Sequence, residues 1–241
     1  MMQIAGKMVL VTGGTDGIGR QLALQLLARG ADVWITGRDP ERLARARAEG
    51  MDAIAADLTG PDGIEAVLRG LAGRSLDILI NNAGMGTDHD FRIATPDVAG
   101  DDRTLWLNVH APIRLIVALM ATLQTRPEAM IVNVTSGLAI APSAGAPVYC
   151  ATKAAMRSYT QSLRAQMKGT RVHVLEALPP LVDTAMTSGR GGRKLSAQDC
   201  AAQIVAAIEA SADEANVGMV RILKAVNQVA PWLARRIMIG F

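Results

Sequence analysis

Residues 7–30 read KMVLVTGGTDGIGRQLALQLLARG, and this stretch decides the fold. Residues 7–12 are mainly apolar, as in a buried strand, and the segment after the glycines has the periodicity of an amphipathic helix. Gly13, Gly17 and Gly19 allow a tight turn and let backbone N–H groups approach a pyrophosphate at the start of that helix. Strand, glycine turn and helix in this order favour a dinucleotide-binding cradle over a plain connecting turn.

Strand-like and helix-like segments alternate along the rest of the chain. Gly30 is typical of the end of a helix, and Asp39 followed by Pro40 is typical of the cap and first residue of the next helix. The alternation predicts an α/β fold with a Rossmann-type, doubly wound parallel sheet of about seven strands and helices on both faces. The further strand candidates are residues 32–36, 51–56, 77–81, 130–135, 171–177 and 217–222.

The composition is typical of one compact domain over residues 1–241, because half of the residues are hydrophobic. The net charge of +3 and the 3% of aromatic residues argue against a nucleic-acid partner. Cys150 and Cys200 are too few for a disulfide framework, and Cys150 is expected to be a small buried filler. The three histidines lack metal-ligand spacing, so no metal site is expected. Nothing before Lys7 resembles a signal peptide, which predicts a cytoplasmic protein.

A second pattern lies in PVYCATKAA, where Tyr149 and Lys153 are four residues apart and share one face of a predicted helix. A free tyrosine has a pKa near ~10 and is a poor base at neutral pH, but a nearby ammonium favours the phenolate. Ser136 ends the strand-like run MIVNVTSG and can hold a carbonyl oxygen while Tyr149 gives or takes the proton. These three residues predict a hydride-transfer site.

Tyr-x-x-x-Lys alone often occurs by chance on a solvated helix, but with the other motifs the chain resembles the short-chain dehydrogenases/reductases. TGGTDGIG at residues 12–19 matches the glycine loop of that family, and NNAG at residues 81–84 matches its fourth-strand motif. The family's catalytic tetrad falls on Asn108, Ser136, Tyr149 and Lys153. With TSG and EALPPLVDT, the motifs look similar to the branch named for an association with D-alanylation of lipoteichoic acid.

The resemblance implies an oxidoreductase that transfers a hydride between nicotinamide C4 and a ketone, aldehyde or secondary alcohol. It implies that Lys153 also binds the nicotinamide ribose, that Asn108 holds a water for proton relay, and that Asp57 contacts the adenine. It implies a homodimer or homotetramer built from the helices that carry Asn108 and Tyr149. The cofactor-binding positions that it gives are Gly13, Thr15, Asp16, Gly17, Ile18, Gly19, Arg38, Asp57, Leu58, Asn82, Ala83, Gly84, Tyr149, Lys153, Pro179, Val182 and Thr184.

Two positions depart from the family pattern. Pro180 stands where the family has glycine, and because proline fixes φ and lacks an N–H, the wall before Thr184, the expected carboxamide contact, is predicted to be stiff. Gly37 stands where NAD-dependent members carry an acidic residue, and the guanidinium of Arg38 suits a 2′-phosphate. We therefore predict NADP(H) over NAD(H). The alternative is that Arg38 is a solvated surface charge, and the glycine loop lacks the extra basic residue often found before Gly17.

Two loops are expected to shape the substrate pocket, at residues 85–100 and 185–194, because ligands of such sheets bind beyond the carboxyl ends of the strands. Glycines and basic residues in the second predict a mobile lid over residues 185–195. A basic lid, with Arg190 and Arg193, favours an anionic substrate, and a plain solvated loop is the alternative.

The last segment, residues 223–241, has apolar residues at roughly helical spacing with Arg235 and Arg236 near its end. Two interpretations stand. The apolar stripe packs on the chain's own core or on a partner subunit, which is the commoner arrangement, or it lies on a membrane or covers a lipid-like substrate.

Three functions remain open at this stage. The first is a carbonyl reductase or alcohol dehydrogenase with Tyr149 as the acid and base. The second is a dinucleotide-sensing regulatory or scaffold protein without turnover, since a fold alone does not fix function. The third is a reductase of a tethered or lipid-like carbonyl in a biosynthetic pathway. A sensor needs the glycine loop but has no need of the other catalytic residues, and this favours an enzyme.

Overall fold

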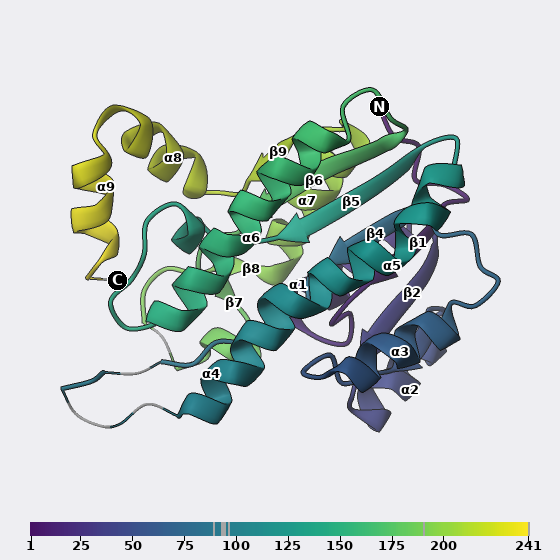
Figure 1. Ribbon diagram of the computed structural model, residues 1–241, viewed down its shortest axis with the longest axis horizontal. Coiled ribbons are helices and arrows are strands. Elements are labelled where there is room, and N and C mark those ends of the chain that lie inside the picture. Colours follow the sequence, from purple (N-terminus) through teal and green to yellow (C-terminus); the bar gives the residue numbers. More distant parts are fainter. Residues whose placement is uncertain (89, 93–94, 96, 190, 241) are drawn as a thin grey trace.

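The computed structural model describes residues 1–88, 90–92, 95, 97–189 and 191–240. Within them, a seven-stranded sheet has the order β3-β2-β1-β4-β5-β6-β9, and every neighbouring pair is parallel (Figure 1). This confirms the predicted doubly wound α/β fold. The strands are β1 (Met8–Val11), β2 (Asp32–Gly37), β3 (Asp52–Ala55), β4 (Ile78–Asn81), β5 (Ala129–Val134), β6 (Val172–Leu178) and β9 (Glu214–Asn216).

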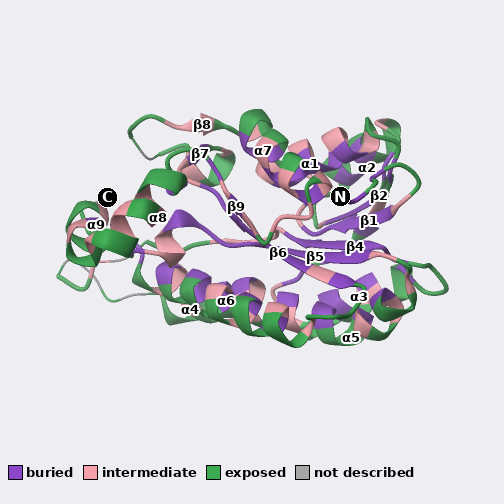
Figure 2. Cartoon of the chain, turned by 90° about the horizontal axis from the view of Figure 1, so that it is seen from above, coloured by how far each residue is buried: buried purple, intermediate pink, exposed green. Residues whose placement is uncertain are grey.

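Helices cover both faces of the sheet, as Figure 2 shows. One face carries α1 (Gly17–Leu27), α2 (Pro40–Ala48) and α7 (Ala197–Glu209), and the other carries α3 (Pro61–Gly70), α4 (Val98–Leu105), α5 (Ala111–Thr125) and α6 (Pro147–Gln166). Each face therefore has its own hydrophobic core. Because both faces are covered, β1, β4 and β5 are buried along their whole length, which explains their mainly apolar sequences.

The strand order positions the site. β1 pairs with β2 on one side and β4 on the other, so the chain reverses its direction of winding between β1 and β4. In open α/β sheets a ligand crevice forms beyond the carboxyl ends of the strands at such a reversal. The glycine loop after β1 and the NNAG segment at the end of β4 both lie there.

One predicted strand is wrong. Residues 217–222 do not form the last strand; β9 is Glu214–Asn216, and helix α8 (Val220–Val229) begins soon after it. Val217 and Val220 are both buried, which produced the strand-like pattern, but Gly218 turns the chain with φ +53° between them. The predicted loop at residues 85–100 also ends earlier than expected, because α4 begins at Val98.

The expected lid lies between two short strands, β7 (Val182–Asp183) and β8 (Leu195–Ser196), which pair in parallel. Residues Ala185–Thr187 form a 3₁₀ turn directly after β7. Arg190 lies outside the described residues. The segment therefore begins and ends at a small second sheet, while its motion remains a prediction.

The C-terminal segment is helical as predicted, in two pieces, α8 and α9 (Pro231–Met238), separated at Ala230. Ala234 is buried, but Val229, Trp232 and Ile237 are exposed. The interpretation that this apolar stripe packs on the chain's own core is therefore wrong for these three side chains.

In the described part of the chain, one helical run, Val98–Thr125, is long and apolar enough to cross a membrane by length and composition. It comprises α4, a π-helical turn at Trp106–His110 and α5. Its inner face, with Leu115, Ile116 and Leu119, is buried against the sheet. We therefore interpret it as a core helix of this domain.

Candidate active site

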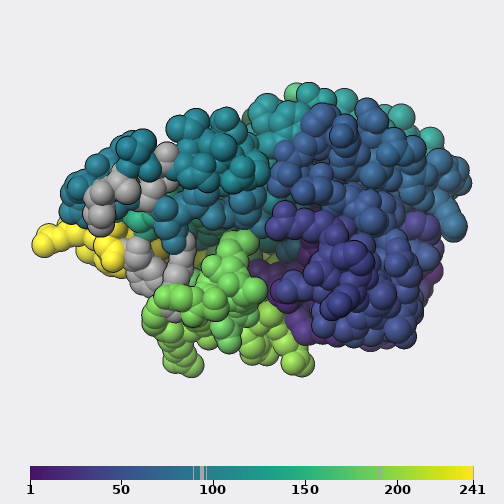
Figure 3. Space-filling model, turned by 90° about the horizontal axis from the view of Figure 1, so that it is seen from below, coloured from purple at the N-terminus to yellow at the C-terminus, as the bar shows by residue number. Residues whose placement is uncertain are grey.

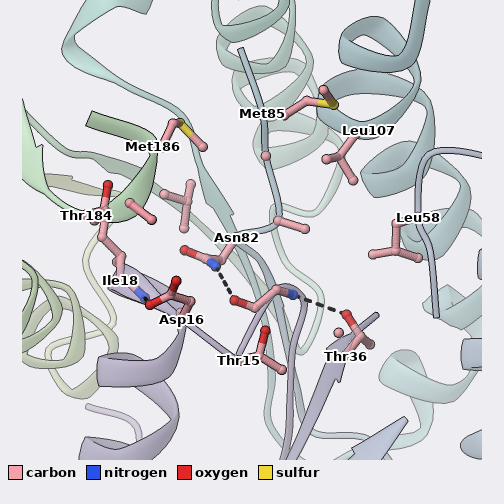
Figure 4. A pocket seen from close by; sticks show the side chains of 18 of the residues that line it. Thr15, Asp16, Ile18, Thr36, Leu58, Asn82, Met85, Leu107, Thr184 and Met186 are labelled. Atoms are coloured by element: carbon pink, nitrogen blue, oxygen red, sulfur yellow. Dashed lines mark hydrogen bonds between the residues drawn. The ribbon is translucent and has the colours of Figure 1, made fainter. Parts of the chain in front are cut away.

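A cavity of about 410 Å³ opens beyond the carboxyl ends of the central strands (Figure 4). Every cofactor position predicted from the sequence lines it, as do Ser136, Tyr149 and Lys153. Of the predicted tetrad, Asn108 alone is not among the lining residues; it is buried behind the wall. The fold therefore brings residues from widely separated segments to one place. Met85 and residues 185–187 line it from the two loops predicted to shape the pocket, and Gly37 and Pro180 line it at the two positions that depart from the family pattern. Lining residues that sequence reasoning missed are Thr36, Arg42, Ala56, Thr59, Leu107, Val134 and Thr135.

The glycine loop fits a bound pyrophosphate because side chains would fill it. A Cβ on Gly19 would lie 2.3 Å from both the Gly13 carbonyl oxygen and the Asn82 side chain, and Gly13 itself has φ +64° and lies against Ala83. Asp16 caps α1, its Oδ1 accepting from the Gly17 N–H at 2.8 Å. Ile18 and Gly19, at the start of this helix, line the cavity, and helix N-termini, whose first N–H groups lack acceptors within the helix, favour an anion.

Two strand-end threonines hold this cradle in shape. The Thr12 hydroxyl accepts from the N–H groups of Asn82 and Ala83, each at 3.0 Å, which ties the end of β4 to the end of β1. The Thr36 hydroxyl accepts from the Gly13 N–H at 3.1 Å. Threonine at the end of a buried strand, directly before the glycines, is the signal that could have identified both.

The far end of the cavity contains the residues predicted to bind the adenosine part of the cofactor. A Cβ on Gly37 would lie 2.3 Å from Thr15 Cγ2, so a larger residue at this position would require the Thr15 side chain to move. Arg38 follows and lies 3.8 Å from Asp57. Burial opposes ionisation of Asp57, but hydrogen bonds from the backbone and hydroxyl of Thr59, with the Arg38 charge, outweigh it and lower the carboxyl pKa.

Two more arginines from α2 stand at the same end. Arg42 forms an ion pair with Asp16 at 2.6 Å, and Arg45 donates to the Thr15 carbonyl at 3.2 Å. The sequence analysis assigned no role to Arg42. The contact is set by tertiary packing of α2 against the glycine loop, for which the local sequence carries no pattern.

The reactive end is formed by the ends of β5 and α6. Lys153 is only 5% exposed, donates to the Val134 carbonyl at 3.0 Å, and has its Nζ 5.5 Å from the centroid of the Tyr149 ring. Burial lowers the Lys153 pKa to about 8. Ser136 is buried at the end of β5, and its hydroxyl accepts from the Leu138 N–H at 3.1 Å, which leaves its own proton for another acceptor.

Asn108 sits in the π-helical turn between α4 and α5. Its Oδ1 accepts from the Met85 N–H at 3.0 Å, and its Nδ2 donates to the Met85 carbonyl at 2.8 Å and to the Thr152 hydroxyl at 3.0 Å. A Cβ on Gly84 would lie within 3.4 Å of both Asn108 Oδ1 and Lys153 Nζ, so glycine there keeps these two groups close. π-Helical turns of this kind often occur at functional sites.

The remaining candidate groups carry no sign of chemistry. Cys150 is buried, and its sulfur contacts the backbone of Ser143. Among the described residues no group of three or more His, Cys, Asp or Glu side chains could hold a metal ion.

Comparison with known proteins decides the family. The model of the short chain dehydrogenase family matches residues 7–194. The chain belongs to this family. The uncharacterized oxidoreductase DltE of Bacillus subtilis is 40% identical over 189 residues, covering 77% of this chain and 75% of DltE.

Solved structures of the family agree over the whole fold. A short chain dehydrogenase from Burkholderia cenocepacia, in complex with NADP, has a TM-score of 0.87 at 26% identity, covering 98% of this chain and 99% of that one. The 3-ketoacyl-(acyl-carrier-protein) reductase of Brucella melitensis, complexed with NADH, has a TM-score of 0.79 at 26% identity, covering 88% and 96%. This short-chain dehydrogenase is an NAD(P)-dependent oxidoreductase, and its cavity is lined by the residues that the sequence assigned to the dinucleotide.

Proposed function

We propose that this short-chain dehydrogenase is an NADPH-dependent reductase of ketones or aldehydes. The observation that carries the proposal is the convergence of Tyr149, Lys153 and Ser136 on the cavity that begins at the glycine loop. When bound, NADPH supplies the hydride that the carbonyl carbon receives. The chain's own groups act on the carbonyl oxygen and its proton.

Ser136 and Tyr149 divide the work at that oxygen. The Ser136 hydroxyl donates a hydrogen bond to it, which polarises the carbonyl and stabilises the charge that develops there. Tyr149 transfers its phenolic proton to the same oxygen. The buried ammonium of Lys153 favours the phenolate that remains, because its charge is weakly screened in this position. Asn108, next to Lys153, is the proposed entry point for the proton that restores Tyr149.

Packing at Gly37 and charge at Arg38 support NADPH over NADH. The acidic side chain that would receive the ribose hydroxyls of NADH is absent, because glycine stands at position 37, packed beside Thr15. Arg38 and Arg42 instead place guanidinium groups at this end, and a guanidinium can bind a phosphate with two hydrogen bonds. Asp16 holds Arg42 at 2.6 Å, closer than Asp57 lies to Arg38 at 3.8 Å, so Arg38 is the residue we assign to the 2′-phosphate.

Apolar side chains support a substrate with an apolar body. Met85 and Met186 lie on opposite sides of the cavity in Figure 4. The loop at Gly86 packs on the Tyr149 ring, where a Cβ would lie 3.0 Å from Cδ2. Lys194, in the proposed lid, is tied to the Thr187 carbonyl, so Arg193 is the residue of the described part of the lid that we propose for an anionic substrate group.

A homodimer or homotetramer in the cytoplasm completes the proposal. The outer faces of α5 and α6 expose Val117 and small residues such as Ala154 and Ser158, which allow close helix packing between subunits.

The test is oxidation of NADPH and NADH by the purified protein with a panel of ketones and aldehydes, run beside Tyr149→Phe. Tyr159→Phe on the same helix is the matched control. We expect turnover with NADPH that Tyr149→Phe abolishes and Tyr159→Phe preserves, with NADPH binding intact in both. Tight dinucleotide binding without turnover on free, tethered or lipid-like carbonyls would overturn the proposal in favour of a sensor.

A further inference from the structure

The C-terminal arm, residues 219–240, presents an apolar outer surface. Val229 is 88% exposed, Trp232 65% and Ile237 54%. Ile222 and Val229 are seven residues apart, so they lie on one face of α8. On α9, Trp232 shares a face with Arg235 and Arg236, and Ile239, the C-cap residue, extends that face. Figure 3 shows the arm, in yellow, protruding at one end of the surface.

The arm is also strongly basic. Residues 217–241 contain Arg221, Lys224, Arg235 and Arg236 and no Asp or Glu. Lys224 pairs with Glu214, and Arg221 donates to the Asn216 carbonyl. Across the described residues, no acidic side chain pairs with Arg235 or Arg236. Two guanidinium groups therefore stand beside exposed apolar side chains without a counter-charge from the described chain.

The arm is held firmly on the catalytic side of the domain. A Cβ on Gly137, the residue after Ser136, would lie 3.1 Å from Val220 Cγ2, so α8 packs directly on the end of β5. The Ile239 carbonyl accepts from the Ala144 N–H at 3.1 Å, in the segment that leads to Tyr149. Figure 1 shows the arm beyond the carboxyl end of β6. Whatever binds the arm is thus brought to the end of the molecule where the cavity opens.

We infer that the C-terminal arm docks on an anionic lipid surface. Amphipathic helices with a tryptophan and basic residues lie in the headgroup region, with apolar side chains inserted and cations at the lipid phosphates. A second copy of the chain fits the arm less well. A two-fold contact sets the same patch against itself, and this patch would then face its own unpaired arginines with no acidic residue to meet them. Docking would place the cavity beside the membrane. The inference does not depend on the proposed reductase activity.

The inference is tested by co-sedimentation of the full-length protein with vesicles of phosphatidylcholine alone or with added phosphatidylglycerol. We expect binding to the anionic vesicles, weakened by high salt, and little binding to the neutral ones. Arg235→Gln with Arg236→Gln should weaken binding roughly 30-fold, since each basic residue near the surface contributes roughly fivefold. Trp232→Ser with Val229→Ser should abolish the binding that survives high salt.

Matched controls separate docking from general effects. Arg69→Gln with Lys168→Gln removes two exposed cations elsewhere, and Val98→Ser removes an exposed apolar side chain from α4. Both control variants should bind vesicles like the unmodified protein, and NADPH binding by every variant reports its fold. Equal binding by the arm variants and the unmodified protein, or no binding at all, would overturn the inference. The inference would also be overturned if Trp232→Ser turned a dimer into a monomer in light scattering and left vesicle binding unchanged. That result would assign the arm to an interface with a second copy of the chain.

Discussion

Asn108 holds Met85 at both of its backbone polar groups, accepting from the N–H at 3.0 Å and donating to the carbonyl at 2.8 Å. The contact joins the π-helical turn to the segment that leaves β4, directly after Gly84. One amide side chain therefore fixes the cavity wall at Met85 and also lies near Lys153. Replacing it should disturb geometry and proton transfer together.

Asn108→Ala is expected to lower kcat by about 100-fold, because general acid–base steps contribute that much and the wall at Met85 loses its support. The two Met85 groups lose their partner at a cost of about 1–3 kcal/mol in stability. Steady-state kinetics, urea unfolding and hydrogen exchange at the Met85 amide measure the three effects. Asn227→Ala on α8 is the control. If hydrogen exchange at the Met85 amide and the activity of Asn108→Ala both match those of the unmodified protein, the Asn108–Met85 hydrogen bonds have no role in the reaction.

The sequence was enough for the fold and for the motif residues, because their signals are local. A strand followed by glycines, or Tyr and Lys one helical turn apart, can be read within ten residues. The remaining features depend on contacts across the sequence. The pairing of Arg42 with Asp16 joins two elements, and the hydrogen bonds of Asn108 with Met85 join α4–α5 to β4. The strand predicted at residues 217–222 was wrong because Val217 and Val220 are apolar as buried residues of a turn and a helix start, and not as members of a strand.

The pH dependence of carbonyl reduction should follow Lys153. Burial lowers its pKa to about 8, so the ammonium that supports the Tyr149 phenolate is present below that pH and is lost as the pH rises through it. We expect kcat/KM to fall about tenfold per unit above the break, as one proton is lost. The folded protein also binds fewer protons than the unfolded chain between this pKa and the usual lysine value, so this group makes stability rise with pH in that range. A profile flat through pH 8 to the lysine range would contradict the assignment.

Gly19→Ala should close the dinucleotide cradle. The new Cβ would lie 2.3 Å from the Gly13 carbonyl, and backbone cannot move aside as a flexible side chain can. We expect the Kd for NADPH to rise more than about tenfold, measured by fluorescence titration. Gly60→Ala is the matched control, since a Cβ there meets nothing within 4 Å. Equal affinity in the two variants would remove the glycine loop from the binding site.

Arg38→Ala tests the cofactor preference. The side chain is 75% exposed, so its charged hydrogen bond to a 2′-phosphate is expected at the low end of the usual range, and the KM for NADPH should rise roughly tenfold. The KM for NADH should stay within about twofold, because it has no 2′-phosphate. Arg103→Ala on α4 should change neither. A clear preference of the unmodified protein for NADH would refute the NADPH assignment.

Glu176 is a fully buried carboxyl that ties the site to its surroundings. It accepts from the Thr135 hydroxyl at 2.8 Å, beside Ser136, and from Arg157 on α6 at 2.8 Å. Arg157 also reaches Glu214 at 3.7 Å. Burial raises the Glu176 pKa, against the Thr135 hydrogen bond and the Arg157 charge, while Glu214 adds to the rise. The pair therefore holds β5, β6 and α6 in register behind the reactive residues.

Arg157→Met should destabilise the protein by about 3–5 kcal/mol near neutral pH, because it leaves a buried carboxylate without its cation. The folded-state pKa of Glu176 lies above the unfolded value, so the folded protein binds more protons between the two and stability falls as pH rises through that window. Without the Arg157 charge, the folded-state pKa of Glu176 rises further above the unfolded value, and this pH range widens. The stability lost in Arg157→Met should therefore be smaller in acid, where Glu176 is protonated. Urea unfolding at several pH values measures it. Arg69→Met, which breaks the exposed Arg69–Glu65 pair on α3, should cost less than about 0.5 kcal/mol at every pH, since exposed pairs contribute little. A loss in Arg157→Met as small as this, or one independent of pH, would mean that Glu176 is already neutral in the folded protein and needs no counter-charge.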